Sequence, residues 1–278
     1  HRFSAYISCD GIDGMLSYRN GVRDSIDWCR RTGVTKVYLE TFRDAWARKG
    51  DLLKVRRAFR EAGIETGGGM AHCWIPPDGR RCYHDRSKQK IVMRISEFTA
   101  SLFDDIIVDD FWFYDCDDAR SQALFAARKV VVNGKEYPVT GDSVSDYRCT
   151  LMYHLARENI VGAAKRVNPG ARVFIKFPQW YDEWYRMGYD VFRQTAVFDG
   201  IWVGTEIREF DSDSFGGRVP PTAYYMSMWL GRGIGGAKYG GAWYDELATS
   251  PATYVEQARM TVLGGARETV LWYLDPVV

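Results

Sequence analysis

The sequence predicts an α/β fold in which eight parallel strands close into a (β/α)8 TIM barrel. The chain has 278 residues, and one such barrel commonly takes about 250. Short apolar runs alternate with segments whose apolar residues recur at helical spacing, which is typical of a parallel sheet covered by helices. Several apolar runs also end abruptly in a charged residue, as barrel strands do where they open into a site.

The first half of the chain contains four predicted strands, at 4–9, 36–39, 64–71 and 106–108. The glycines at 67–69 fall within the third strand and indicate close packing rather than a phosphate loop. Each of the first three strands is followed by an amphipathic helix with one apolar stripe. The stripes are Val22, Ile26 and Cys29, then Leu52, Val55, Phe59 and Ala62, and then Ile91, Ile95, Phe98 and Leu102.

The second half supplies four more strands and four more helices. The strands are predicted at 172–175, 201–205, 237–243 and 269–273, and the helices at 144–167, at 187–197, from Pro220 and from Pro251. Ser250 before Pro251 is a helix cap followed by a proline at the first helical position. Seven helices for eight strands leave the eighth helix missing or truncated. We therefore expect the natural protein to continue into an additional C-terminal module.

An insertion at 115–144 separates the fourth strand from its helix. It contains Asn133-Gly134 between two alternating β segments, which is the strongest short signal for a β-hairpin. We expect this hairpin over the active-site face, either as a lid or substrate-selecting wall or without any ligand contact. With the insertion included, residues 1–278 are predicted to form a single catalytic barrel domain.

The overall charge excludes several classes of partner. Lys plus Arg number 37 and Asp plus Glu number 36, so no charge excess would attract nucleic acid or an anionic membrane. No apolar stretch approaches the ~20 residues that span a bilayer. The chain begins almost inside the first strand, so we expect a removed upstream signal and a secreted or periplasmic protein.

The six cysteines fit small buried side chains, since none forms a C-x-x-C pair. In a secreted protein a disulfide such as Cys73–Cys82 is an alternative, and the spacing does not decide between the two.

The predicted strand tips carry an unusual number of polar groups. Charged side chains are rarely buried without a partner or a purpose, so these tips are candidate site positions. The tip residues are Asp10, Glu40, His72, Asp109 with Asp110, Lys176, Glu206, Asp245 and Asp275.

Asp109, Asp110 and Glu206 are the candidate catalytic residues, because each follows a strongly apolar strand. Two carboxyl positions facing one funnel are what glycosidic bond cleavage requires. Adjacent strand residues point to opposite sides, so only one of the two aspartates should face the funnel squarely.

The remaining tip residues and the nearby aromatic side chains predict carbohydrate binding. Aromatic residues make up 15% of the chain, and their rings stack on the apolar faces of sugars. The predicted substrate-binding residues are Asp10, Glu40, His72, Trp112, Lys176, Trp180, Arg208, Trp243 and Asp245.

Other chemistries have weaker signals. Four histidines without an H-x-H or H-E-x-x-H pattern predict no metal site, and we expect no cofactor. The alternatives are a non-catalytic carbohydrate-binding barrel and a metal-assisted barrel lyase or isomerase with acidic and His72 ligands. Lys176 also allows a Schiff-base aldolase, although its acidic surroundings oppose a lowered lysine pKa.

Four segments resemble a poorly characterised group of TIM-barrel glycoside hydrolases from polysaccharide-degrading bacteria. The resemblance covers most of the chain and implies a glycosidase that acts on an oligo- or polysaccharide. The segments are 109–113 (DDFWF), 176–182 (KFPQWYD), 198–206 (FDGIWVGTE) and 256–266 (EQARMTVLGGA).

The plan is more distantly similar to the α-galactosidase-like clan of retaining enzymes. That similarity implies that Asp109 or Asp110 on the fourth strand is the nucleophile, with a slight preference for Asp109. It also implies that Glu206 on the sixth strand is the acid/base, although the clan has Asp there. Together with the residues, it predicts a retaining, exo-acting glycoside hydrolase.

Overall fold

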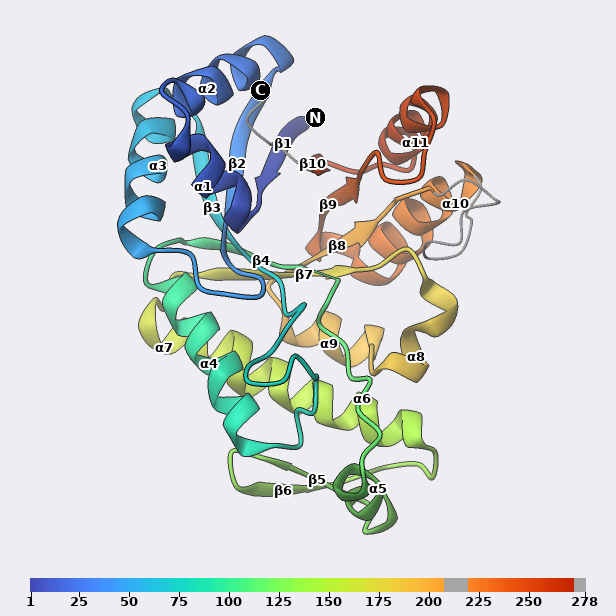
Figure 1. Cartoon of the computed structure of the whole chain (residues 1–278). Helices are drawn as coiled ribbons and strands as arrows, with labels where there is room; N and C mark the ends of the chain where they lie inside the picture. Colours follow the sequence, from blue (N-terminus) through green and yellow to red (C-terminus); the bar gives the residue numbers. More distant parts are fainter. Residues whose placement is uncertain (208–219, 273–278) are drawn as a thin grey trace.

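The structure, a computed structural model, describes residues 1–207 and 220–272 and confirms the predicted barrel (Figure 1). Eight parallel strands close in the order β1-β10-β9-β8-β7-β4-β3-β2. The strands are β1 (Arg2–Ile7), β2 (Val34–Phe42), β3 (Glu65–Met70), β4 (Asp105–Val108), β7 (Arg172–Phe177), β8 (Gly200–Gly204), β9 (Tyr239–Tyr244) and β10 (Glu268–Trp272).

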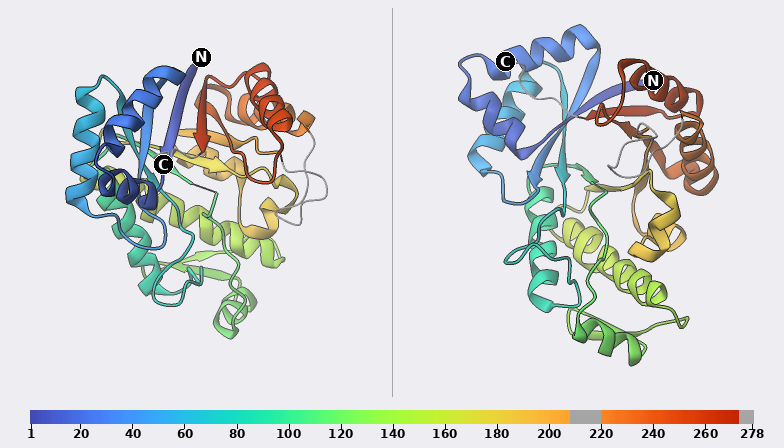
Figure 2. Two further views of the ribbon diagram at one scale, coloured as in Figure 1. Left: turned by 45° about the horizontal axis from the view of Figure 1, so that its top comes forward. Right: turned by 45° about the vertical axis from the view of Figure 1, so that its right-hand side comes forward.

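Helices surround the barrel and link successive strands, as the two views of Figure 2 show. None of the described helices is long and apolar enough to cross a membrane. The predicted helix at 144–167 is continuous through a π-helical segment, and Ser250 caps the last described helix by accepting a bond from Thr253 N. The helices are α1 (Cys9–Ser17), α2 (Gly21–Thr32), α3 (Lys49–Glu61), α4 (Arg86–Ala100), α5 (Ala119–Ala126), α6 (Val144–Leu155), α7 (Gly162–Val167), α8 (Trp184–Met187), α9 (Val191–Val197), α10 (Pro220–Tyr225) and α11 (Pro251–Leu263).

Aromatic side chains fill the inside of the barrel. Tyr6, Tyr38, Trp202 and Trp243 belong to one buried cluster. The glycines of β3 make room for them, since a Cβ at Gly69 would lie 2.4 Å from the Tyr6 ring. The predicted packing role of these glycines is therefore confirmed. Because the interior is filled, a ligand can enter only at an end of the barrel.

Buried charges at the amino-terminal end of the barrel are paired with one another. Lys36 Nζ lies 2.6 Å from Asp105 Oδ2, and the Arg172 guanidinium binds the same carboxylate at 2.7 Å. These residues start β2, β4 and β7, so this cluster lies at the opposite end from the strand tips. It is a structural ion cluster and serves below as a control for the site.

The insertion forms the predicted hairpin, but its predicted position is wrong. β5 (Lys129–Val132) pairs antiparallel with β6 (Lys135–Pro138). The Gln89 side chain on α4 bonds both Val131 O and Asn133 N, so the hairpin lies against the helices below the barrel in Figure 1. No residue of 115–144 lines the pocket described below. The reason is the apolar face of β5, where Val130 and Val132 are fully buried and require a helical surface to cover them.

Cys82 and Cys116 form a disulfide, so the expected Cys73–Cys82 pairing is wrong. Cys73 instead remains a thiol and lies 3.2 Å from Arg43 Nη1. The bond joins the loop after β3 to the loop after β4 across a sequence separation of 34 residues. It therefore fastens two of the loops that border the site.

Replacing both Cys82 and Cys116 by serine is expected to lower the free energy of unfolding by about 2–4 kcal/mol. A loop of this length restricts the unfolded chain by roughly that amount. Urea unfolding of the oxidised protein and the double variant measures the difference. A reductant should lower the midpoint of the wild type and leave that of the variant unchanged; an unaffected wild type would contradict a stabilising disulfide.

Candidate active site

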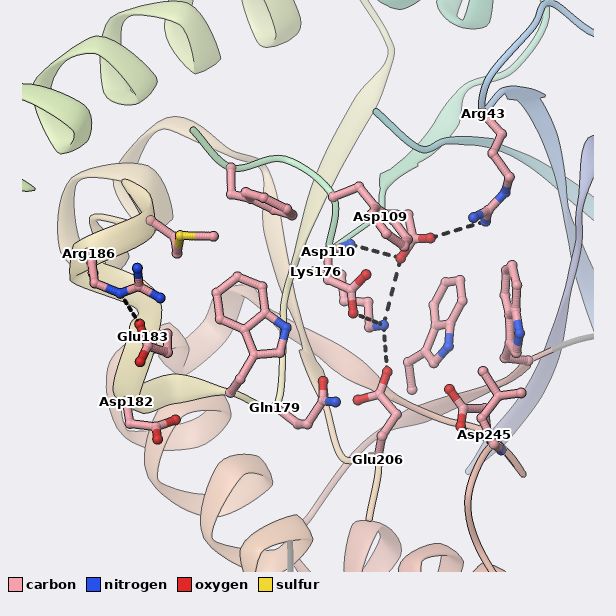
Figure 3. A pocket seen from close by; sticks show the side chains of 17 residues that line it. Arg43, Asp109, Asp110, Lys176, Gln179, Asp182, Glu183, Arg186, Glu206 and Asp245 are labelled. Carbon is pink, nitrogen blue, oxygen red and sulfur yellow. Dashed lines mark hydrogen bonds and ion pairs between the residues drawn. The ribbon is translucent and has the colours of Figure 1, made fainter. Parts of the chain in front are cut away.

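A pocket of about 610 Å³ opens at the carboxyl ends of the barrel strands (Figure 3). Four carboxylates line it, from Asp109 and Asp110 after β4, Glu206 after β8, and Asp245 after β9. A cavity of this size falls within the roughly 300–1,000 Å³ usual for small-molecule sites. The barrel geometry thus gathers side chains that are far apart in the sequence into one ligand-sized space.

Lys176 lies at the centre of these carboxylates, as Figure 3 shows. Its Nζ donates to Glu206 Oε1 at 2.6 Å and to Asp110 Oδ2 at 2.9 Å, and lies 3.7 Å from Asp109 Oδ1. The side chain is only 2% exposed and approaches the Trp243 ring, 4.4 Å from its centre. The carboxylates raise the lysine pKa above its ordinary value despite the burial, which on its own would lower it. Lys176 is therefore a permanent cation.

The contacts of Lys176 limit the spacing of the carboxyls. Contacts of 2.6 and 2.9 Å to one nitrogen leave the Glu206 and Asp110 oxygens at most 5.5 Å apart. Contacts of 2.6 and 3.7 Å leave the Glu206 and Asp109 oxygens at most 6.3 Å apart. Retaining glycosidases place their two carboxyls about 5–5.5 Å apart and inverting enzymes about 6.5–9.5 Å apart. The spacing thus suits a retaining reaction.

Asp109 is the carboxyl most affected by burial. Its side chain is 2% exposed and accepts one hydrogen bond from Asp110 N at 2.9 Å. Burial, followed by repulsion from Asp110 and Glu40, raises the pKa of Asp109 to about 7 against the opposing attraction of Lys176 and Arg43. Asp109 can therefore hold a proton near neutral pH.

Arg43 supports Asp109 from behind the pocket. Its Nη2 lies 3.5 Å from Asp109 Oδ2 but only 2.8 Å from Glu40 Oε1, and its Nε donates to Glu40 Oε2 at 3.0 Å. Glu40 also accepts bonds from Tyr6 Oη and Cys9 N. Most of the Arg43 charge is thus neutralised by Glu40, and only a weaker attraction reaches Asp109.

Aromatic rings form the apolar walls of the pocket. Trp243 and Trp272 stack on each other with ring centres 5.4 Å apart, and Trp180 meets Phe113 edge to face at 5.8 Å. Such walls, combined with a few polar groups, suit a ligand with apolar faces and hydroxyl edges. Sugars have this chemistry.

The structure brings seven of the predicted site residues to the pocket, and their roles stay predictions. Both aspartates of the pair line it, contrary to the expectation that only one would face it, because β4 ends at Val108 and strand alternation ends with it. The seven residues are Asp109, Asp110, Lys176, Trp180, Glu206, Trp243 and Asp245.

Asp10 and Glu40 are not pocket residues, so these two predictions are wrong. β1 ends at Ile7 and Ser8 caps α1, which leaves Asp10 exposed in the first turn of that helix. β2 continues to Phe42, so Glu40 lies within the strand and binds Arg43. In both cases the strand ends at a different residue from the apolar run.

His72 and Trp112 are also misassigned. Both are fully buried, with ring centres 5.0 Å apart, and the Tyr83 ring lies 5.0 Å from that of Trp112. Burial lowers the pKa of His72 to about 3, so its ring is uncharged. Both side chains pack beneath the loops and do not line the pocket. Arg208, predicted to bind substrate, and Asp275 lie outside the described residues.

Sequence reasoning missed several residues that line the pocket. Arg43 appeared only as a partner for Glu40, and nothing in its local sequence separates a pocket arginine from a surface one. Gln179, Asp182, Glu183 and Arg186 follow β7 in one polar and aromatic segment. Their position directly after a barrel strand was an available signal, since such loops build the site.

The described residues contain one group with spacing suited to a metal ion, Cys82, Cys116 and Asp118. Its two sulfurs are joined to each other in the disulfide and cannot act as thiolate ligands. The group therefore does not support a metal centre.

Comparison with known proteins assigns the chain to a family. A family model described as the catalytic domain of a probable glycosyl hydrolase matches residues 1–278. An uncharacterized protein of Saccharolobus solfataricus, SSO3021, is 26% identical over 306 residues, an alignment that covers 99% of this chain and 49% of that protein. The chain thus spans about half the length of the curated relative it matches.

Solved structures show a similar fold at low sequence identity. GH5_18 from Streptomyces cattleya, a variant in complex with Manβ1-4GlcNAc, has a TM-score of 0.62 and 12% identity, covering 98% of this chain and 70% of that one. The exo-β-1,4-mannosidase Op5Man5 from Opitutaceae bacterium strain TAV5 has a TM-score of 0.59 and 11% identity, covering 98% and 52%. At such identities these likenesses establish the barrel fold alone.

Proposed function

Because this chain belongs to the family of probable glycosyl hydrolase catalytic domains, we propose that it is a retaining, exo-acting glycosidase of an oligo- or polysaccharide. The observation that carries the retaining mechanism is the Lys176 bridge, which leaves Asp110 and Glu206 oxygens at most 5.5 Å apart. That separation leaves room for attack on an anomeric carbon but not for an additional water between the carboxyls.

Either carboxyl position can supply either role. The resemblance to the α-galactosidase-like clan implies a nucleophilic aspartate on β4 and an acid/base at Glu206. The opposite assignment uses the same positions with the roles exchanged. In both, a glycosyl-enzyme ester forms on one carboxyl while the other protonates the leaving oxygen and then activates water.

Two features support action at the end of a sugar chain. The pocket has the size of a small-molecule site, and its tryptophans can stack on a sugar ring. The neighbours solved with Manβ1-4GlcNAc or named as an exo-β-1,4-mannosidase support β-mannosides among the first substrates to test. Trp243, Trp180 and Asp245 are the proposed sugar-binding side chains.

A panel of 4-nitrophenyl α- and β-glycosides, together with β-1,4-manno-oligosaccharides, tests this function. We expect turnover of at least one substrate, with one sugar released from the chain end and its anomeric configuration retained by proton NMR. Glu206→Ala serves as the inactive control. Inverted product would contradict the retaining mechanism. Sugar binding without turnover would favour a non-catalytic carbohydrate-binding barrel instead.

We also propose that the protein acts outside the cytoplasm in polysaccharide degradation. The Cys82–Cys116 disulfide supports this, because such bonds persist in oxidising compartments. Fractionation of the producing cells, with detection of the protein by antibody, is expected to find it in the periplasm or the medium.

A further inference from the structure

The buried charges around Lys176 do not balance. Glu40, Asp109, Asp110 and Glu206 carry four negative charges when ionised, whereas Arg43 and Lys176 carry two positive ones. A buried cluster with two excess negative charges is costly, and taking up a proton relieves that cost. The distances indicate which carboxyl takes it.

Asp109 has the weakest contacts with cations. Arg43 is bound to Glu40 at 2.8 and 3.0 Å, and its distance to Asp109 is 3.5 Å. Lys176 lies 2.6 Å from Glu206 and 2.9 Å from Asp110 but 3.7 Å from Asp109. The short contacts keep Glu206 and Asp110 ionised, because a protonated carboxyl would give up most of that attraction.

We infer that Asp109 holds the proton of this site and acts as its general acid/base, while Glu206, held ionised by Lys176, is the nucleophile. The inference rests on the proposed function and exchanges the roles that the clan resemblance implies. Asp110 is then a positioning residue that, together with Glu206, holds the Lys176 ammonium in place.

The surroundings of Asp109 agree with a bound proton. It is almost completely buried, and burial is the largest influence raising its pKa. Groups from five strands or their following loops face it, and only two of them are cationic. They are Tyr6, Glu40, Arg43, Cys73, Asp110, Lys176 and Tyr189.

The position of Glu206 suits a nucleophile. Its Oε1 is held by Lys176, and the side chain lines the pocket. Gly204 leaves the space that the second oxygen occupies, since a Cβ there would lie 2.4 Å from Glu206 Oε2. The carboxylate is thus held at one oxygen by a cation and fitted closely at the other, which fixes its orientation for attack.

The reaction is then written in two displacements. A Glu206 oxygen bonds to the anomeric carbon as the glycosidic C–O bond breaks, and the Asp109 proton passes to the departing oxygen. Water next bonds to the same carbon as the ester bond to Glu206 breaks, and one water proton returns to Asp109. The balance is one glycoside plus one water giving two hydroxyl products.

Leaving-group dependence and azide rescue distinguish the two roles. With Asp109→Ala, we expect a loss of about 10²–10⁴-fold on the phenyl glycoside of the sugar the wild type cleaves. The loss should be under about tenfold on the 2,4-dinitrophenyl glycoside, whose leaving group needs no proton. Azide should then yield a glycosyl azide of retained configuration. Glu206→Ala should be inactive on both glycosides, with azide yielding the inverted product.

The reverse pattern, with inverted azide from an Asp109 or Asp110 variant and retained azide from Glu206→Ala, overturns the inference while leaving the glycosidase function intact. Inverted azide from Asp245→Ala overturns it as well. Failure of the wild type on every glycoside contradicts the function itself.

A second measurement needs no turnover. Difference infrared spectra between pH 5 and 9 should show a protonated carboxyl lost near pH 7 in the wild type and absent from Asp109→Asn. Persistence of that band in Asp109→Asn, with its loss in Glu206→Gln, would place the proton on Glu206 and refute the inference.

Discussion

Replacing Lys176 by methionine is expected to lower turnover of the best 4-nitrophenyl glycoside by about 10³-fold and the free energy of unfolding by about 3–5 kcal/mol. Methionine keeps an apolar stem of similar length but removes the ammonium that lies 2.6 Å from Glu206 and 2.9 Å from Asp110. These buried carboxylates then repel each other without a counter-charge. Steady-state kinetics and urea unfolding measure the two effects.

The stability loss should depend on pH. At pH 5 the carboxyls can take up protons in place of the missing cation, so the loss should be smaller there than at pH 8. The turnover loss should persist at both values, because protonation does not restore an ionised nucleophile held in place.

Lys36→Met is the matched control. Lys36 is as buried as Lys176 and lies 2.6 Å from Asp105, but at the opposite end of the barrel. We expect a comparable loss of stability with turnover within about threefold of the wild type. If Lys176→Met kept more than a tenth of the wild-type turnover, Lys176 would be a structural cation of the same kind as Lys36.

Periodicity made most of the fold predictable. Each barrel strand is a local apolar run, and each described helix after it has a stripe or a cap that local sequence records, as at Leu52, Val55 and Phe59 or at Ser250. Strand order in a closed parallel barrel then follows chain order. The strand tips at Asp109, Lys176 and Glu206 were predictable for the same reason.

Strand ends were less predictable than strand centres. β2 runs through Glu40 because Arg43 and Tyr6 neutralise and bind the buried carboxylate, and those partners come from elsewhere in the fold. β1 stops before Asp10 because Ser8 caps a helix. The sequence next to each residue contains no trace of the first effect and only a weak trace of the second.

Tertiary partners account for the remaining errors. The hairpin was correctly identified from Asn133-Gly134, but its location depends on Gln89 and on the helical surface that covers Val130 and Val132. The disulfide joins Cys82 to Cys116 because two loops meet above the barrel. Neither proximity follows from spacing along the chain.

Asp109→Asn is expected to stabilise the protein in alkaline solution relative to acid solution, by about 2–3 kcal/mol between pH 5 and pH 8.5. The pKa of Asp109 in the folded protein is raised from 3.8 to about 7. The stability that its proton provides is fully present below the ordinary value and is lost as the pH rises through about 7. Asparagine has no proton to lose, so the variant escapes that loss.

Urea unfolding of the wild type and Asp109→Asn at the two pH values measures this difference. Asp110→Asn is the matched control, because it removes a neighbouring carboxylate that accepts a 2.9 Å bond from Lys176. That change should bring no alkaline stabilisation, since it removes the favourable contact of an ionised group. An equal effect of Asp109→Asn at both pH values would mean that Asp109 is already ionised at pH 5. The excess negative charge of the cluster would then have to be relieved at another carboxyl, and Asp109 could not be the acid of the site.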